Sequence, residues 1–268
     1  MSKIHFVLQG KGGVGKSMCA FFLVQFLRRH DREVAAFDAD PVNATLYAFA
    51  SSAGYPVERV ELLDEADMLE PRRFDLLIDR LSRLPERTHA VVDNGSSSFL
   101  AAMGYLRESG VFDLLRENGH TVYAHTVITG GQAARDTLNG LELLERVFPG
   151  TPVIVWRNPF FGEVPSAKAP CIELPEDNRS MTFRDVELVL AEKLSFEDAM
   201  RQAESLMVSK RLKEFWDKLC AAIETTDILR EDDPPSGGYV PTDGNGEESS
   251  AGEGDHNGGE QHEGGGNG

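Results

Sequence analysis

Short apolar segments alternate with longer segments of helical periodicity along most of the chain. The apolar segments are rich in Val, Ile, Ala and Phe, and they lack strict alternation with polar residues, as expected for strands buried on both faces. We predict strands at 4–8, 34–38, 90–93, 121–129, 152–156 and 171–174, and a short edge strand near 59–62. Helical patterns predict helices at 16–30, 72–84, 98–118, 132–148, 182–193 and 205–225.

Strand and helix in turn predict an α/β fold, a mostly parallel sheet with helices on both faces. In such sheets the ligand binds at the carboxyl ends of the strands. The side chains of a functional site are therefore expected in the segments that follow each predicted strand.

Composition divides the chain into two parts. The chain has 268 residues and 41% hydrophobic residues, enough for one large folded domain. Residues 231–268 contain ten acids, no Lys or Arg and twelve glycines, so this segment contributes −10 to the net charge of −17. We expect a folded domain at 1–230 and a disordered, acidic, Gly-rich tail at 231–268.

Cysteine usage and hydropathy favour a cytoplasmic protein. Cys19, Cys171 and Cys220 share no metal-binding spacing, so we expect reduced thiols. No apolar run reaches transmembrane length, and no signal peptide is recognised before the first strand.

The most specific motif lies between the first predicted strand and helix. Residues 10–17 read GKGGVGKS and fit the P-loop pattern G-x-x-x-x-G-K-[ST], in which backbone N–H groups surround phosphates. We expect Lys16 to reach the β- and γ-phosphates of ATP and the Ser17 hydroxyl to bind Mg²⁺. The expected nucleotide-binding residues here are Gly10, Lys11, Gly12, Gly13, Val14, Gly15, Lys16, Ser17 and Met18.

Carboxylates follow two further predicted strands. Asp38 and Asp40 lie at the end of the second strand, two residues apart, and would face the γ-phosphate and Mg²⁺ beside this P-loop. Asp93 ends the apolar run 89–93, the Walker B arrangement in which an aspartate holds Mg²⁺. Aspartates are also common in turns at strand ends, which is the alternative for all three.

Two later strand ends are candidates for the adenine site. The amide of Asn158, after the fifth of the apolar strands, could hydrogen-bond the edge of the base. The segment 174–177, with Pro175, could close over it.

Other polar features favour ordinary structural roles. His5, His30, His89, His120 and His125 show no ligand spacing, so we predict core or surface roles and no transition-metal site. The helix at 205–225 has one apolar and one basic face. We expect it to pack on the core; a DNA-phosphate face or a membrane-surface helix are the alternatives.

The second lysine of the motif, Lys11, makes the P-loop resemble those of the deviant Walker A ATPases. That superfamily includes partition (ParA) and division-site (MinD) ATPases, the nitrogenase iron protein and dethiobiotin synthetase. The opening segment 3–17, with 128–131 and 156–158, is also similar to the TraL proteins encoded in conjugative-plasmid transfer regions. The resemblance spans roughly residues 1–225.

The resemblance implies an ATP-dependent homodimer in which Lys11 of one subunit reaches the phosphates of the other. It further implies that Asp40 orients the attacking water and that Asp38 lines the same site, which makes Lys11, Lys16, Asp38 and Asp40 the expected catalytic residues. The sequence departs from partition ATPases after Asp93, where it reads NGSS without the usual proline turn. The segment after Asp40 also lacks the usual glutamine, so partner coupling can differ.

These observations predict a Mg²⁺-dependent, partner-stimulated ATPase that is an accessory factor in conjugative transfer, with a protein partner in the transfer machinery. A ParA-type partition ATPase that binds DNA is one alternative. A metabolic enzyme like dethiobiotin synthetase is another. Membrane association is not expected, because no amphipathic anchor ends the chain.

Overall fold

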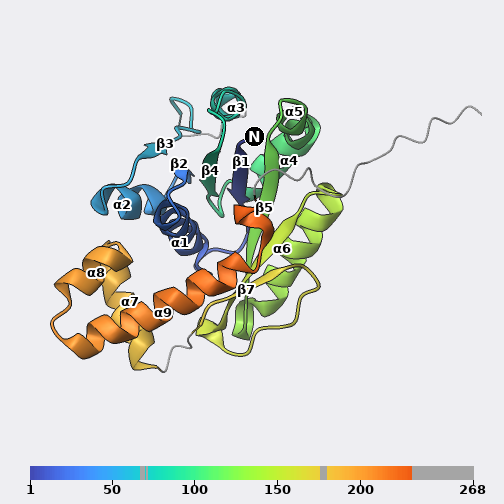
Figure 1. Cartoon of the computed structure of the whole chain (residues 1–268). Coiled ribbons are helices and arrows are strands. Elements are labelled where there is room, and N and C mark those ends of the chain that lie inside the picture. Colours follow the sequence, from blue (N-terminus) through green and yellow to red (C-terminus); the bar gives the residue numbers. More distant parts are fainter. Residues whose placement is uncertain (67–69, 71, 176–179, 231–268) are drawn as a thin grey trace, which may run out of the picture. The chain divides into compact units, whose positions relative to one another are not determined.

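The computed structural model describes residues 1–66, 70, 72–175 and 180–230. Seven strands form one sheet in the order β3-β2-β4-β1-β5-β6-β7, and every neighbouring pair is parallel (Figure 1). The strands are β1 (Lys3–Val7), β2 (Glu33–Ala39), β3 (Val57–Arg59), β4 (Thr88–Asn94), β5 (Thr121–Thr129), β6 (Val153–Asn158) and β7 (Cys171–Glu173).

Helices cover both faces of the sheet. One face packs against α1 (Lys16–Arg29), α2 (Thr45–Ser52), α7 (Met181–Ala191), α8 (Phe196–Gln202) and α9 (Leu206–Glu224). The other packs against α3 (Arg73–Ser82), α4 (Phe99–Glu108), α5 (Val111–Glu117) and α6 (Ala134–Val147). Three short 3₁₀ turns complete the described chain: η1 (Gly131–Ala133), η2 (Pro159–Phe161) and η3 (Asp227–Leu229).

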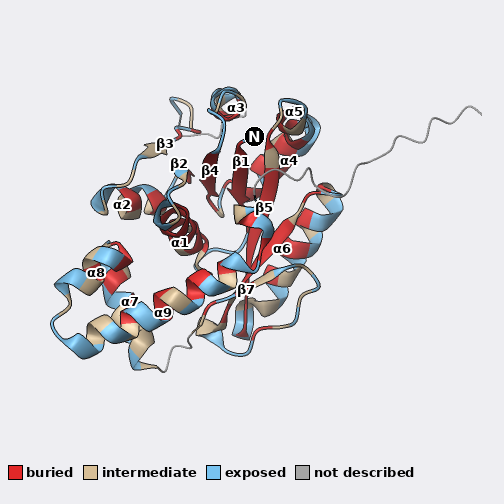
Figure 2. Ribbon diagram, viewed as in Figure 1, coloured by how far each residue is buried: buried red, intermediate tan, exposed pale blue. Residues whose placement is uncertain are grey.

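The central strands are buried on both sides, as Figure 2 shows. All five residues of β1 and all seven of β4 are buried. Two-sided burial explains why these strands lack polar alternation in the sequence. The predicted α/β fold, with a parallel sheet and helices on both faces, is confirmed.

Several element boundaries differ from the prediction. The single helix expected at 98–118 is wrong, because Gly110 adopts φ 59° and separates α4 from α5. The edge strand expected near 59–62 lies earlier, at β3. The short helices α2 and α8 were not predicted, since seven or eight residues give too little periodicity to detect. The expected acidic tail, 231–268, lies outside the described residues.

Helix α9 packs on the core as expected. Its apolar face is buried, and its basic side chains are balanced by acids: Lys210 lies 3.5 Å from Glu214, Arg211 pairs with Asp185 at 2.6 Å, and Lys213 pairs with Asp217. This pairing does not favour a DNA-phosphate face. In the described part of the chain, no helix is long and apolar enough to cross a membrane.

Candidate active site

The P-loop joins the carboxyl end of β1 to the start of α1. Gly13 and Gly15 have φ values of 75° and 100°, a left-handed conformation that strongly favours glycine. Leu8 N–H donates to the carbonyl of His125 at 2.8 Å, which keeps the chain in the sheet until the loop begins. The loop therefore has the conformation that turns its N–H groups towards an anion.

Two side chains hold the loop from either side. The Gln9 amide nitrogen donates to the carbonyls of Val127 at 3.0 Å and Thr137 at 3.1 Å, and its oxygen accepts from Lys11 N–H at 3.2 Å. Asn158 donates from Nδ2 to the carbonyl of Val14 at 3.0 Å. The sequence analysis missed Gln9, because a glutamine before a P-loop belongs to no motif.

Asn158 and Pro175 are placed near the end of their strands, as the pattern predicts. The Asn158 oxygen accepts from Phe160 N–H at 3.1 Å, so both polar atoms of this side chain make protein hydrogen bonds. This arrangement supports the P-loop directly, and contact with adenine stays a prediction. Pro175 follows β7, and the rest of its predicted segment, 176–177, lies outside the described residues.

Lys16 lies at the base of the loop. It is only 7% exposed, and its ammonium donates to the carbonyl of Lys11 at 3.3 Å. Burial lowers the pKa of Lys16, while the charges of Asp93 and Asp40 act in the opposite direction. The lysine is thus a buried cation facing carboxylates.

Asp93 is the most unusual group of the site. Both of its carboxylate oxygens are buried and have no hydrogen-bond partner among the described residues. The pKa of Asp93 is raised to about 7, mainly by burial; the neighbouring Asp38 and Asp40 also raise it, whereas the Ser17 hydroxyl and Lys16 lower it. The Ser17 hydroxyl lies beside this carboxylate and favours its charged form. Buried carboxylate oxygens without partners, beside a serine hydroxyl, fit the oxygen ligands that Mg²⁺ takes.

Asp38 and Asp40 each accept two hydrogen bonds, but they differ in which oxygens accept them. Asp38 is the register partner of Asp93 and is fully buried; its two oxygens accept from the N–H groups of Asp40 at 3.0 Å and Tyr47 at 2.8 Å. Burial raises the pKa of Asp38, and these two hydrogen bonds oppose the shift.

Asp40 leaves one oxygen open. Its Oδ1 accepts from the N–H groups of Val42 at 2.9 Å and Asn43 at 3.0 Å, whereas Oδ2 makes no hydrogen bond within the described chain. Gly95 lies directly against this carboxylate, since a Cβ at position 95 would fall 2.6 Å from Asp40 Cγ. The structure therefore brings together Lys16, Ser17, Asp38, Asp40 and Asp93.

Lys11 lies apart from this group. Its ammonium pairs with Asp136 of α6 at 2.9 Å, and the two side chains are 43% and 55% exposed. Lys11 is thus the predicted P-loop site residue whose side chain forms an exposed ion pair.

Four of the five described histidines and two of the three cysteines are buried. His5, His89 and His125 are buried in the sheet, and the three cysteines are free thiols. No group of three or more metal-capable side chains occurs in the described ranges. Strand order brings these histidines together, which the sequence analysis did not foresee.

The parallel sheet, the glycine-rich loop at its carboxyl edge and the buried Lys16 beside Asp93 define a P-loop nucleotide-binding protein. Residues 5–207 match the family model CbiA, the CobQ/CobB/MinD/ParA nucleotide binding domain. The chain belongs to this family.

Curated relatives and solved structures agree with the family. Two TraL proteins of Escherichia coli are similar: one is 35% identical over 80% of this chain and 93% of its own length, the other 33% identical over 85% and 100%. The fold is similar to the septum site-determining protein MinD of Pyrococcus horikoshii, solved with Mg-ADP, with a TM-score of 0.53 and 18% identity over 84% of this chain and 96% of that one. It is also similar to a protein described as a plasmid partition protein of Borrelia burgdorferi bound to AMPPNP, with a TM-score of 0.54 and 15% identity over 84% and 99%.

Proposed function

We propose that this protein is a Mg²⁺-dependent ATPase that dimerises when ATP is bound and is an accessory factor in plasmid conjugative transfer. The observation that carries the ATPase assignment is the buried pair of unpartnered Asp93 oxygens beside Ser17 and Lys16. The Mg-ADP and AMPPNP in the two similar structures support an adenine nucleotide as ligand. The similarity to TraL proteins supports the role in transfer.

Different residues of the site would bind the phosphates, hold the metal and orient the attacking water. The P-loop N–H groups and Lys16 bind the phosphates, and Ser17 and Asp93 would hold Mg²⁺. When bound, the metal supplies positive charge to the phosphates as the transferred group develops charge. Asp40 is held by Val42 and Asn43 so that Oδ2 can accept a hydrogen bond from an attacking water.

Asp38 is a positioning residue in this scheme. Its Oδ1 accepts from Asp40 N–H and its Oδ2 accepts from Tyr47 N–H, so it ties the end of β2 to α2. The direction of the Asp40 carboxylate follows from these bonds together with the contact with Gly95.

Lys11 would act across the dimer. In the single chain it pairs with Asp136 on the surface, and an exposed pair of this kind contributes about 0.2–1 kcal/mol. ATP phosphates of a second subunit carry more negative charge than one carboxylate, so exchange of Asp136 for phosphate is favourable in the dimer.

Sedimentation of the full chain with and without Mg-ATP tests this proposal. Wild type should shift from monomer to dimer with ATP, and Lys11→Ala should bind ATP but stay monomeric with reduced hydrolysis. Lys210→Ala, which removes a remote paired cation, is the control and should behave as wild type. A normal ATP-dependent dimer and normal turnover in Lys11→Ala would rule out the role across the dimer.

Two further measurements, ATP turnover with small metabolites and DNA binding against salt, separate the alternatives. ATP turnover that requires a small metabolite, without any dimer, would indicate a metabolic enzyme. DNA binding that weakens steeply with salt only in the ATP state would indicate a partition-type protein.

A further inference from the structure

Gln9 joins the first turn of the P-loop to helix α6. Its side chain is 1% exposed, and its amide nitrogen donates to the carbonyls of Val127 at 3.0 Å and Thr137 at 3.1 Å. Carbonyls can only accept, so these two bonds fix which end of the amide is the nitrogen. The amide oxygen therefore points the other way, where it accepts from the N–H of Lys11 at 3.2 Å.

Helix α6 leaves room for this amide at Gly140. A Cβ at position 140 would fall 2.4 Å from Gln9 Oε1 and 2.8 Å from Gln9 Nε2. A glycine in a helix interior is less favourable than alanine, so its presence calls for a reason. The reason here is the close approach of the Gln9 amide to the backbone of α6.

The first turns of α6 are fixed to the sheet. Thr137 is fully buried, its hydroxyl oxygen accepts from Thr129 N–H at 3.3 Å, and its hydroxyl donates to the carbonyl of Ala134 at 2.9 Å. Thr129 is the last residue of β5, so Thr137 is held at the carboxyl edge of the sheet. Gln9 is thus bonded to a part of the molecule that is itself held in place.

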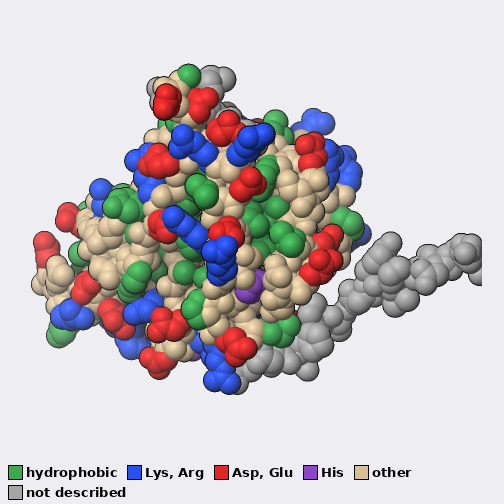
Figure 3. All heavy atoms as spheres, turned by 90° about the horizontal axis from the view of Figure 1, so that it is seen from above, with side chains coloured by type: hydrophobic (Ala, Val, Ile, Leu, Met, Phe, Trp, Pro, Cys, Tyr) green, Lys and Arg blue, Asp and Glu red, His purple; other side chains and the backbone are tan. Residues whose placement is uncertain are grey.

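The same turn of α6 also holds the side chain of Lys11. The Lys11 ammonium pairs at 2.9 Å with Asp136, the neighbour of Thr137. Exposed charges of both signs are common on this protein, and Figure 3 shows them interspersed over one face. The Lys11 pair differs from an ordinary surface pair, because Gln9 ties the backbone N–H of the same lysine to Thr137. One turn of α6 therefore sets both the backbone and the side chain of Lys11.

Lys16 gives the backbone of Lys11 a second support. Its ammonium donates to the carbonyl of Lys11 at 3.3 Å. In the proposed ATP complex this ammonium bonds the phosphates, which are stronger acceptors than a neutral carbonyl. Among the described side chains, Gln9 is then the one that still holds the backbone of Lys11.

We propose that Gln9 is a positioning residue that fixes the backbone of Lys11 while the Lys11 ammonium exchanges Asp136 for the phosphates of a second subunit. Gln9 has this role only if Lys11 acts across the dimer, so the role rests on the proposed function. Without Gln9 the P-loop keeps Lys16 and its glycines, but the direction of Lys11 is no longer set. ATP binding should therefore persist while dimerisation and hydrolysis fall.

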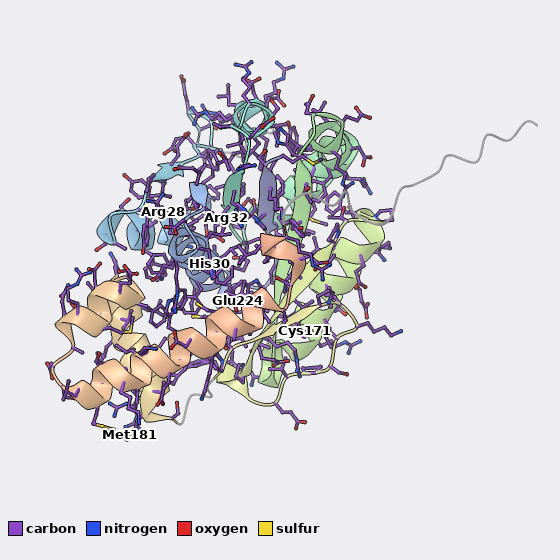
Figure 4. All side chains as sticks on the ribbon, in the orientation of Figure 1. Arg28, His30, Arg32, Cys171, Met181 and Glu224 are labelled. Atoms are coloured by element: carbon purple, nitrogen blue, oxygen red, sulfur yellow. The ribbon has the colours of Figure 1, made fainter. Side chains whose placement is uncertain are left out.

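Full-length Gln9→Met tests this split, because methionine has a similar length and makes none of the four bonds. Calorimetry should give an ATP affinity within about 3-fold of wild type, and hydrolysis should fall at least about 10-fold. Gln25→Met is the matched control: Gln25 is 4% exposed, and its oxygen accepts from Phe196 N–H at 2.8 Å. It lies one turn before Arg28, which Figure 4 labels near the end of α1. Normal hydrolysis in both variants would overturn the proposal.

A double-mutant cycle separates positioning from general support of the loop. If Gln9 acts through Lys11, Gln9→Met/Lys11→Ala should hydrolyse ATP at the rate of Lys11→Ala alone. Losses that multiply would mean that Gln9 acts independently of Lys11, which would also overturn the proposal.

Hydrogen exchange of the Lys11 N–H, measured without nucleotide, does not depend on the proposed function. Exchange should be at least about 10-fold faster in Gln9→Met and in Gly140→Ala, whose added Cβ displaces the amide. Gly104→Ala is the control, since its added Cβ meets no described atom outside its own helix backbone within 4 Å, and exchange should not change. Unchanged exchange in Gln9→Met would overturn the proposal. Normal dimerisation and turnover in Lys11→Ala, together with faster exchange in Gln9→Met, would refute the role of Lys11 across the dimer and leave Gln9 as a structural support only.

Discussion

The two ends of β4 present opposite chemistry. At the carboxyl end, Asp93 meets Asp38, Asp40 and Lys16, and this group fits the metal cation and phosphates of the proposed nucleotide. At the amino end, His89 lies beside Lys3, Arg32 and Arg87. Its Nδ1 lies 3.1 Å from His5 Nε2, and His5 Nδ1 lies 3.0 Å from His125 Nε2, so three buried histidines form a chain there. The first group is built around a contiguous loop with a recognisable spacing, while the second is assembled from strands far apart in the sequence. A motif search detects only the first, although both are positioned by the same parallel strands.

Replacing Asp93, at the carboxyl end of β4, should have the largest effect on activity. Asp93→Asn removes the buried carboxylate, so Mg²⁺-dependent ATP hydrolysis should fall at least about 100-fold. The nucleotide-free protein should become more stable by about 1–3 kcal/mol, because an unsatisfied buried charge is removed. Thermal unfolding and phosphate release measure the two effects. Normal Mg²⁺-dependent hydrolysis in Asp93→Asn would contradict the proposed role of this carboxylate in holding the metal.

Gly95→Ala tests the contact that directs Asp40. The added Cβ would lie 2.6 Å from Asp40 Cγ, and that carboxylate cannot move freely because Oδ1 accepts two N–H groups. Hydrolysis should fall about 10-fold with ATP affinity nearly unchanged. Gly104→Ala in α4 is the control, since no atom of the described chain outside its own helix backbone lies within 4 Å of its Cβ position, and it should be neutral or stabilise by about 1 kcal/mol. Normal hydrolysis in Gly95→Ala would contradict the proposal that the position of the Asp40 carboxylate orients the attacking water.

The buried histidines at the amino ends of the strands make the free energy of unfolding depend on pH. Burial lowers the pKa of His89 and His125 to about 3, and Lys3 and Arg32 add to the shift at His89. An unfolded histidine has a pKa near 6.5, so the unfolded chain binds more protons below that pH. The histidine contribution to the free energy of unfolding should therefore be complete above about pH 6.5 and fall towards pH 3, by about 1.4 kcal/mol per pH unit for each histidine. Asp93 acts in the opposite sense, because its pKa of about 7 makes the folded chain bind the extra proton.

Denaturant unfolding at pH 7 and pH 5 measures this slope. His125→Gln keeps a side chain that can hydrogen-bond but cannot titrate. The change of its free energy of unfolding with pH should therefore be smaller than that of wild type by the contribution of one histidine. Identical slopes would mean that the buried histidines do not control acid stability.

Asp136→Asn should have the smallest effect. Loss of an exposed ion pair frees Lys11 and should lower the ATP concentration needed for dimerisation by about 2- to 5-fold. Sedimentation against ATP concentration measures it. A higher ATP requirement would instead place Asp136 in the dimer contact itself.

Local patterns predicted the fold class, most strands and the residues of the P-loop site, because parallel strands and phosphate loops are encoded in short segments. The break at Gly110 was missed, since apolar periodicity continues through it and one glycine in a helical pattern is tolerated. The roles of Gln9 and Gly95 were missed for another reason: each depends on a contact with a distant residue, Thr137 for Gln9 and Asp40 for Gly95. The His5, His89 and His125 chain depends on the strand order β4-β1-β5, which no local pattern specifies.

Calorimetric titration of ATP with Mg²⁺ into wild type, Lys16→Ala and Lys210→Ala tests the central claim most directly. We predict that wild type and Lys210→Ala bind ATP with equal affinity, and that both bind ATP tightly only when Mg²⁺ is present. Lys16→Ala should lose about 2–3 kcal/mol of binding free energy, because the buried ammonium no longer bonds the phosphates. Unchanged ATP affinity in Lys16→Ala would contradict the assignment of the nucleotide site.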